Sequence, residues 1–387
     1  MSKRIGYIDA MRGFTMILVV YSHVCGFCLG DRQMALNDVL FLFRLPCFFF
    51  ISGWLFAGTF TGTVPRASSE ADYTGTVPHV TFWSIIKKKF MVQIVPTLFF
   101  LFLLSPPPAF FHQFGAFKGG YWFTFALFYF FIIYMLMAWP FRHRQSTKSD
   151  VVMLLLTLAI SMSAYWYDIN YHRLVLAVAD AHSSMVNGQW SIFNVQCSTF
   201  NVPCSMFNVL GLLSYVVWHY YLFFFLGTLV RKYFPQFLKI AGNGKLVACM
   251  AIIFLAISQI PQSDIFLREY FKFSVGGILG MTVIFALFRY LYTSPRLSHY
   301  SSIFHQPSSI LKFVGTRTLD IYLLHYFFLP EFLLPHANRL LATIPSWLLP
   351  LPILFAASIV VALCLLTSRI IRLNPFLAHN LFGAKTK

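Results

Sequence analysis

Residues 14–29 read FTMILVVYSHVCGFCL, a run in which His23 is the only basic side chain and no acidic one occurs. The runs 38–60 and 346–370 are similarly apolar. A helix needs about 20 mostly apolar residues to cross a bilayer, and these runs lack the strict alternation of a barrel strand. No small-residue cleavage site follows the first run, so we interpret it as a membrane span and not as a signal peptide.

The composition supports the same interpretation. Apolar residues make up 58% of the 387 residues, charged residues only 11%, and the mean hydropathy is +0.70. Soluble domains are about 25% charged, so these values exclude a water-soluble globule, a disordered chain and a coiled coil. The net charge of +17 is typical of the cytoplasmic loops of a membrane protein, and we expect the lipid bilayer, not nucleic acid, as the partner.

The predicted fold class is all-α, a polytopic transmembrane helical bundle of about ten spans with both termini cytoplasmic. The orientation follows from the positive-inside rule, because 21 Lys and Arg fall on one side of these spans and 6 on the other. The expected spans are residues 10–30, 38–60, 88–105, 120–140, 150–167, 208–230, 245–261, 271–292, 313–334 and 346–370.

We expect a single membrane domain over residues 1–375, followed by a short basic cytoplasmic tail at 376–387. Two connections are long, an inner loop at 61–87 and an outer loop at 168–207. The outer loop carries Cys197 and Cys204, which pair only if that compartment oxidises thiols, so their pairing stays open. We expect no metal site, because no cysteine and histidine pair has zinc-ligand spacing.

Ionisable residues inside spans are candidates for function. Eleven residues separate Arg12 from His23, which places both on one helix face, about 16 Å apart along the axis. Asp9 precedes Arg12 by three residues and can pair with it. The alternatives are an interfacial ion pair for Asp9 and Arg12 and a hydrogen-bonded core histidine for His23. In the second span, Arg44 is expected at the depth of His23.

Four motifs follow one another along the chain. Asp9-x-x-Arg12-Gly with His23 is followed one span later by Pro46-x-Phe-Phe-Phe-Ile-Ser-Gly, then by the sequences YWF at 121–123 and GTRTLDIYLLH at 315–325. Together these motifs resemble the acyltransferase 3 family of ten-span membrane acyltransferases, most closely the sugar O-acetylase branch. The chain departs from the family pattern at Gln93, where an Arg is usual, and at Arg44, where the branch commonly has His.

The resemblance implies transfer of an acyl group, acetyl in the family's usual form, from cytoplasmic acyl-CoA to a hydroxyl of a glycan or glycolipid. His23 would act as the general base or as a covalent acyl carrier, and both routes stay open. Arg44 and Ser52 are candidates to stabilise the oxyanion. The expected donor-binding residues are Arg12, Asp9, Lys87, Lys88 and Lys89. The expected supporting residues are Trp122, Tyr322 and His325.

Acyl-CoA (acetyl-CoA in the usual case) would be a substrate, and no bound cofactor is expected. Any partner acyltransferase would be a separate protein, since we expect no soluble domain after the tenth span. The expected location is the bacterial inner (cytoplasmic) membrane. The alternative function is a secondary transporter or flippase for an anionic solute, for which Asp320 is the main buried carboxylate and no internal repeat is visible.

Overall fold

The structure is a computed structural model that describes residues 5–29, 35–60, 82–104, 121–141, 147–183, 218–261, 265–294 and 301–382. Within these ranges every regular element is helical and no strand occurs. The all-α fold class predicted from the apolar runs is therefore confirmed. Most of the two long loops, with Cys197 and Cys204, lies outside the described residues.

The helices fall into long ones and shorter or irregular pieces. The longer helices are α1 (Gly6–His23), α2 (Ala35–Phe60), α6 (Trp122–Ala138), α7 (Thr147–Ser183), α13 (Gly244–Ser258), α14 (Phe266–Thr293), α16 (Ser301–Thr316) and α19 (Pro350–Ile371). The shorter helices are α3 (Phe82–Lys89), α4 (Val95–Leu104), α11 (Tyr221–Lys232), α12 (Phe234–Gly242), α17 (Thr318–Leu324), α18 (Ala337–Thr343) and α20 (Pro375–Phe382). The irregular turns are the π-helical η1 (Val24–Cys28) and η2 (Phe90–Ile94), and the 3₁₀ turns η4 (Trp139–Phe141), η5 (His325–Phe328) and η6 (Glu331–His336).

Five described helices are long and apolar enough to cross a membrane: Gly6–Cys28, Leu36–Gly58, Thr147–Trp166, Phe266–Thr293 and Pro350–Ile371. Helices α12 and α13 meet at a 79° bend and make a sixth if they are counted as one span. A multi-pass membrane protein is thereby supported by the structure. The full set of ten spans and the cytoplasmic termini stay predictions.

Two of the expected spans are interrupted, and residues 208–217 of the expected span 208–230 lie outside the described residues. The segment 313–334 is divided at Arg317, whose φ of −117° and ψ of 18° interrupt the helix between α16 and α17, and again where η5 begins at His325. The segment 88–105 is divided by η2, which leaves α4 with 10 residues. Pro96 follows η2 and lacks the N–H that would bond to the carbonyl of Val92, and Gly315 lies two residues before Arg317. Hydropathy does not register such breaks and therefore predicts longer helices than the structure has.

Two boundaries also differ from expectation. Helix α7 continues to Ser183, into the segment expected as the outer loop, because no glycine or proline interrupts residues 168–183. The segment expected as a tail contains most of α20, whose buried Phe382 ring lies 6.3 Å from that of Phe100 in α4. The end of the described chain therefore packs onto the bundle.

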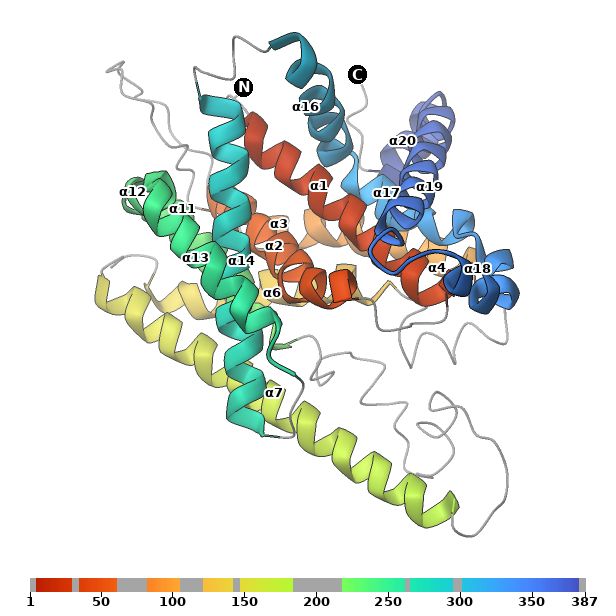
Figure 1. Ribbon diagram of the computed structural model, residues 1–387. Helices are drawn as coiled ribbons and strands as arrows, with labels where there is room; N and C mark the ends of the chain where they lie inside the picture. The colour runs from red at the N-terminus through yellow and green to blue at the C-terminus, as the bar shows by residue number, and fades with distance from the viewer. Residues whose placement is uncertain are drawn as a thin grey trace.

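Helix α1 runs through the middle of the bundle (Figure 1) and packs against α2, α14, α16 and α19. Glycines allow α1 to approach α16 most closely. A Cβ at Gly13 would collide with the carbonyl oxygen of Leu311, and one at Gly315 would collide with the carbonyl oxygen of Asp9. This reciprocal glycine contact lets the backbones of α1 and α16 touch. It fixes where α17, the next helix in the chain, lies against α1.

Candidate active site

His23 is the last residue of α1, and its ring meets that of His325. The Nδ1 atom of His23 lies 2.7 Å from Nε2 of His325, and the two rings stack with centroids 4.8 Å apart. His325 is completely buried, whereas His23 is partly accessible. Of the two imidazoles, only His23 is thus placed to meet a substrate.

The hydrogen bonds of His325 define the tautomer of both rings. Nδ1 of His325 lies 2.8 Å from the carbonyl oxygen of Tyr322, and a carbonyl only accepts, so this nitrogen carries the proton. Nε2 of a neutral His325 then accepts a hydrogen bond from Nδ1–H of His23. This assignment leaves Nε2 of His23 with a free lone pair, the arrangement required of a base or a nucleophile.

The two histidines lie on two segments, His325 where η5 follows α17 and His23 where η1 follows α1. The break at Arg317 starts α17, which ends at Leu324 and places His325 in the first turn of η5. On the other side, α1 ends at His23 and continues as the π-helical η1. Single π-turns inside helical segments are frequent at functional sites. An aromatic wall completes the surroundings, with Tyr326 stacked 5.3 Å from the His23 ring and Phe27 edge-on at 5.8 Å.

Arg44 is held beside the histidine pair by residues on α1 and α2. Its Nη1 donates to the hydroxyl of Ser22 and, at 2.9 Å, to Oδ1 of Asn37. Ser22 in turn donates to Asn37 at 2.7 Å. Ser22 precedes His23 in the chain, and Arg44 lies within electrostatic range of His23. The structure therefore brings Arg44 next to the residue that precedes His23, while their depth in the membrane stays a prediction.

Ser52 occupies a different position. Its hydroxyl donates to the carbonyl oxygen of Phe48, 2.8 Å away in the same helix. Eight residues separate it from Arg44, about 12 Å along the axis of α2. Of the two expected oxyanion donors, the structure brings only Arg44 close to the histidine pair.

Arg12 lies at the other end of the same face of α1. Its Nη2 donates to the buried hydroxyl of Thr318 at 2.7 Å, on the α17 segment that leads to His325. Arg12 and His23 therefore both contact residues 318–325, which agrees with the shared face predicted from their spacing. The pairing of Asp9 with Arg12 stays a prediction; the backbone of Asp9 packs against Gly315.

The three lysines of α3 separate into two kinds. Lys89 points inward, with its Nζ 4.2 Å from the centroid of the Phe131 ring and within electrostatic range of Arg12. Lys87 and Lys88 are exposed. Lys89 therefore lies in the electrostatic range of Arg12, while the other two contribute charge to the surface.

Tyr322 and Trp122 also differ from each other in position. The Tyr322 hydroxyl accepts a hydrogen bond from the backbone N–H of Phe123 at 3.2 Å, which ties α17 to α6. Trp122 stacks on Tyr220, with centroids 6.0 Å apart, and contacts Phe49. Tyr322 thus holds the segment that carries His325, whereas Trp122 belongs to an aromatic cluster between α2, α6 and the residues preceding α11.

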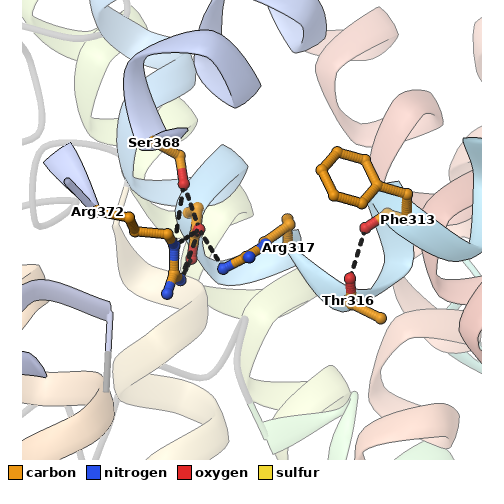
Figure 2. A network of polar contacts seen from close by, with 6 residues as sticks. Phe313, Thr316, Arg317, Ser368 and Arg372 are labelled. Atoms are coloured by element: carbon orange, nitrogen blue, oxygen red, sulfur yellow. Dashed lines mark hydrogen bonds and ion pairs between the residues drawn. The ribbon is translucent and has the colours of Figure 1, made fainter. Parts of the chain in front are cut away.

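The structure adds an ionic network that the sequence did not predict (Figure 2). The buried carboxylate of Asp320 accepts from Ser368 at 2.5 Å and from Nε and Nη2 of Arg372 at 3.0 and 2.8 Å. Arg317 lies 3.7 Å from the same carboxylate. The network joins α17 to α19 and fixes the helix that holds Thr318 and Tyr322. It also gives Asp320 a structural role, where a transporter would need an ionisable carrier of protons.

Thr318 was missed as a site residue, and the contact between the two predicted histidines was not foreseen, because the partners are distant in sequence. Thr318 contacts a residue 306 positions away, and the two histidines are 302 positions apart. Neither spacing carries a local pattern. For Thr318, the available signal was the run of polar residues in segment 315–325, which is otherwise apolar.

The fold and these contacts define a multi-pass membrane protein with a paired histidine at one end of its central helix and basic residues at the other. Comparison with known families agrees with an enzyme of this class. The family model of acyltransferase 3, described as an acyltransferase domain, matches residues 5–369. The chain therefore belongs to the acyltransferase 3 family and is an acyltransferase. Comparisons with curated proteins and with solved structures found no match.

Proposed function

We propose that this protein moves an acyl group, in the simplest case acetyl, from acyl-CoA on the cytoplasmic side to a hydroxyl group of a glycan or glycolipid at or across the membrane. The observation that carries the proposal is the His23–His325 pair, which leaves one imidazole nitrogen with a free lone pair in an otherwise apolar bundle. Acyl transfer to a hydroxyl requires such a group.

In the direct route, Nε2 of His23 takes the proton of the acceptor hydroxyl as its oxygen attacks the thioester carbonyl. The carbonyl becomes an oxyanion, the C–S bond then breaks, and the proton passes from His23 to the departing thiolate. His325 steadies the imidazolium by accepting from its Nδ1–H. Arg44 supplies a cation near the oxyanion, where low polarity strengthens the attraction.

In the covalent route, Nε2 of His23 attacks the thioester carbonyl, and the C–S bond breaks as the thiolate of CoA leaves. The acceptor hydroxyl then attacks the acylated imidazole, the bond from the acyl carbon to Nε2 breaks, and the hydroxyl proton neutralises the thiolate, which restores His23. The same tautomer serves both routes. Single-turnover experiments separate them, because only the covalent route leaves labelled acyl on the protein when the acceptor is omitted. The label should disappear on addition of acceptor and be missing from a His23→Gln variant.

Donor binding is assigned to the basic end of α1. Arg12 and Lys89 lie within electrostatic range of each other and would attract the phosphates of the donor, with Asp9 orienting Arg12. Lys87 and Lys88 add long-range attraction. Because Arg12 and His23 lie about 16 Å apart on one face, a donor anchored at Arg12 must extend along α1 to bring its thioester to His23.

The proposed location is the bacterial cytoplasmic membrane, with both termini inside and residues 168–207 outside. Cysteine labelling tests this orientation, since an external reagent should reach a cysteine introduced at Asn187 and miss one at Gly62. Reversed labelling would contradict the proposed orientation and, with it, the assignment of the donor to the cytoplasmic side. A separate partner acyltransferase would be needed if the final acceptor lies beyond the reach of the bundle.

The function itself is tested with purified protein in liposomes, supplied with radiolabelled acetyl-CoA. We expect label to pass to a hydroxyl-bearing glycan fraction, and mass spectrometry of surface glycans should show the loss of one acyl mass when the protein is removed. Uptake of an anionic solute without any acyl transfer would instead support the transporter alternative.

A further inference from the structure

Two arginines approach the first turn of α1, at the end of the helix away from the histidine pair. Arg231 is in the last turn of α11, and Arg289 lies near the end of α14. Both are within electrostatic range of the Tyr7 hydroxyl on α1, and all three side chains are partly accessible. The mechanism above has no role for these residues.

Packing holds both guanidinium groups in place. The guanidinium of Arg231 lies 5.0 Å from the centroid of the buried Trp54 ring. Nη1 of Arg289 donates to the carbonyl oxygen of Leu238 in α12 at 3.4 Å. A Cβ at Gly242 would lie 2.9 Å from the same Nη1, so this glycine leaves room for the guanidinium. Two positive charges are thus held near one hydroxyl group.

Neither guanidinium is paired with a carboxylate within the described part of the chain. Asp150 of α7, which reaches the end of α11, pairs with Lys232 at 2.7 Å instead. Partly buried cations that lie close together repel each other and are normally balanced by an anion. Because the described residues supply no such anion, the arrangement points to one that binds from outside the chain.

The chemistry of the site favours a phosphate group. Guanidinium groups only donate, and they pair with phosphate oxygens in a bidentate manner. The neighbouring rings of Trp54 and Phe285 are buried, so they cannot stack on a nucleotide base. Tyr7 precedes Arg12 by five residues, about 140° around α1, so the site faces away from the proposed donor-binding residues. Both observations argue against the nucleotide of the acyl donor as the occupant.

The surroundings of the site favour a phospholipid. The positive-inside rule places this end of α1 on the cytoplasmic side, where basic pockets between helices bind anionic headgroups. We propose that Tyr7, Arg231 and Arg289 bind the phosphate of an anionic phospholipid headgroup. This inference goes beyond the proposed function and does not depend on it. Exposed apolar side chains on α12 and α14 give the acyl chains a surface nearby: Ile240, Leu287 and Leu291.

The test titrates the purified protein in neutral detergent with short-chain phosphatidylglycerol and counts bound lipid by native mass spectrometry. Phosphatidylcholine is the comparison lipid, because its choline cation is repelled by the two guanidinium groups. The wild-type protein should bind phosphatidylglycerol about 10-fold more tightly, the value of one hydrogen bond to a charged group. Arg231→Gln and Arg289→Gln should each lose most of this preference. Arg369→Gln, the same change at an exposed position of α19, is the matched control and should keep it.

Two results would overturn the proposal. Equal binding of the two lipids by the wild-type protein would show that no anionic headgroup is recognised, and this comparison stays decisive if a variant folds poorly. A preference that persists in both glutamine variants would assign the lipid to general surface charge and not to this site. No acyl transfer is measured, so a failure of the proposed function leaves both results unaffected.

The same phosphate chemistry could come from the acyl donor or from free phosphate. Desulfo-coenzyme A and inorganic phosphate are therefore added as competitors, each at the concentration of the lipid. Phosphatidylglycerol that stays bound in the presence of both supports the lipid as the occupant. Displacement by desulfo-coenzyme A would assign the site to the nucleotide of the donor, and displacement by inorganic phosphate would assign it to the free anion. Either displacement would make the lipid assignment wrong.

Discussion

The two ends of α1 differ in chemistry: the His23 end is organised by hydrogen bonds, and the Arg12 end by positive charge. At the His23 end, two imidazoles and a backbone carbonyl form a chain of directed hydrogen bonds, and His325 is fully buried. At the Arg12 end, Arg12 donates to a threonine hydroxyl, and a second cation, Lys89, lies within electrostatic range of it. The hydrogen bonds at the histidine pair position a proton, whereas the positive charges of Arg12 and Lys89 attract a polyanion such as the donor. Substitutions at one end should therefore change turnover, and those at the other should change donor affinity.

The largest effect is expected at His23. Positioned general bases contribute about 10²- to 10⁴-fold in rate, so His23→Gln should lose that much of kcat while donor KM stays near wild type. Glutamine keeps a hydrogen-bonding side chain but cannot take the proton. The matched control is His336→Gln, at an exposed position of η6, which should retain full activity. Near-normal turnover of His23→Gln would show that the two ends of α1 do not differ as argued.

A somewhat smaller effect is expected at His325, because it acts through His23. His325→Ala removes the acceptor that fixes the Nδ1–H tautomer, and misplacing a catalytic group costs roughly 10²-fold. His325→Asn, which can still accept from Nδ1–H, should recover part of kcat. If His325 only filled space, a purely apolar variant such as His325→Leu would rescue turnover as well as Asn.

The sequence predicted the shared helix face of Arg12 and His23, but not the contacts that α17 and η5 make with other helices. The shared face of Arg12 and His23 was predictable because α1 is a regular helix from Gly6 to His23, where 3.6-residue periodicity holds. The second histidine was a candidate only through family resemblance, since its contact with His23 spans 302 positions. The network around Asp320 depends on how α17 meets α19, which tertiary packing decides.

The complete set of spans was harder to predict for a related reason. Hydropathy registers whether a segment is apolar, but not whether its backbone is broken. The break at Arg317 and the π-helical turns η1 and η2 all interrupt apolar segments, and the nearby Gly26, Pro96 and Gly315 leave the mean hydropathy of those segments high. Two of these interruptions lie beside His23 and Lys89. The features that local sequence failed to predict are thus concentrated at the site, where function and regular geometry compete.

At the Arg12 end, the expected effect is on donor affinity. Hydrogen bonds to charged groups contribute about 1.5–3 kcal/mol, so Arg12→Gln should raise donor KM roughly 10- to 100-fold and change kcat much less. Isothermal titration with a non-transferable acyl-CoA analogue measures the same loss directly. An unchanged dissociation constant would remove Arg12 from the donor site and leave only its contact with Thr318.

The smallest effect, and the one that best separates contact from charge, is expected for Lys87 and Lys88. Both are exposed, so their attraction for the donor acts through solvent and is screened over about 8 Å at physiological ionic strength. Lys87→Gln with Lys88→Gln should therefore raise donor KM a few-fold at low salt and have almost no effect at 0.5 M salt.

Lys89→Gln is the comparison within the same helix. Its inward Nζ lies near Arg12, and its defect should persist as salt rises, because a site removed from solvent is screened much less. If all three lysines lose their effect together with salt, the Arg12 end is a diffuse basic surface and not a binding site.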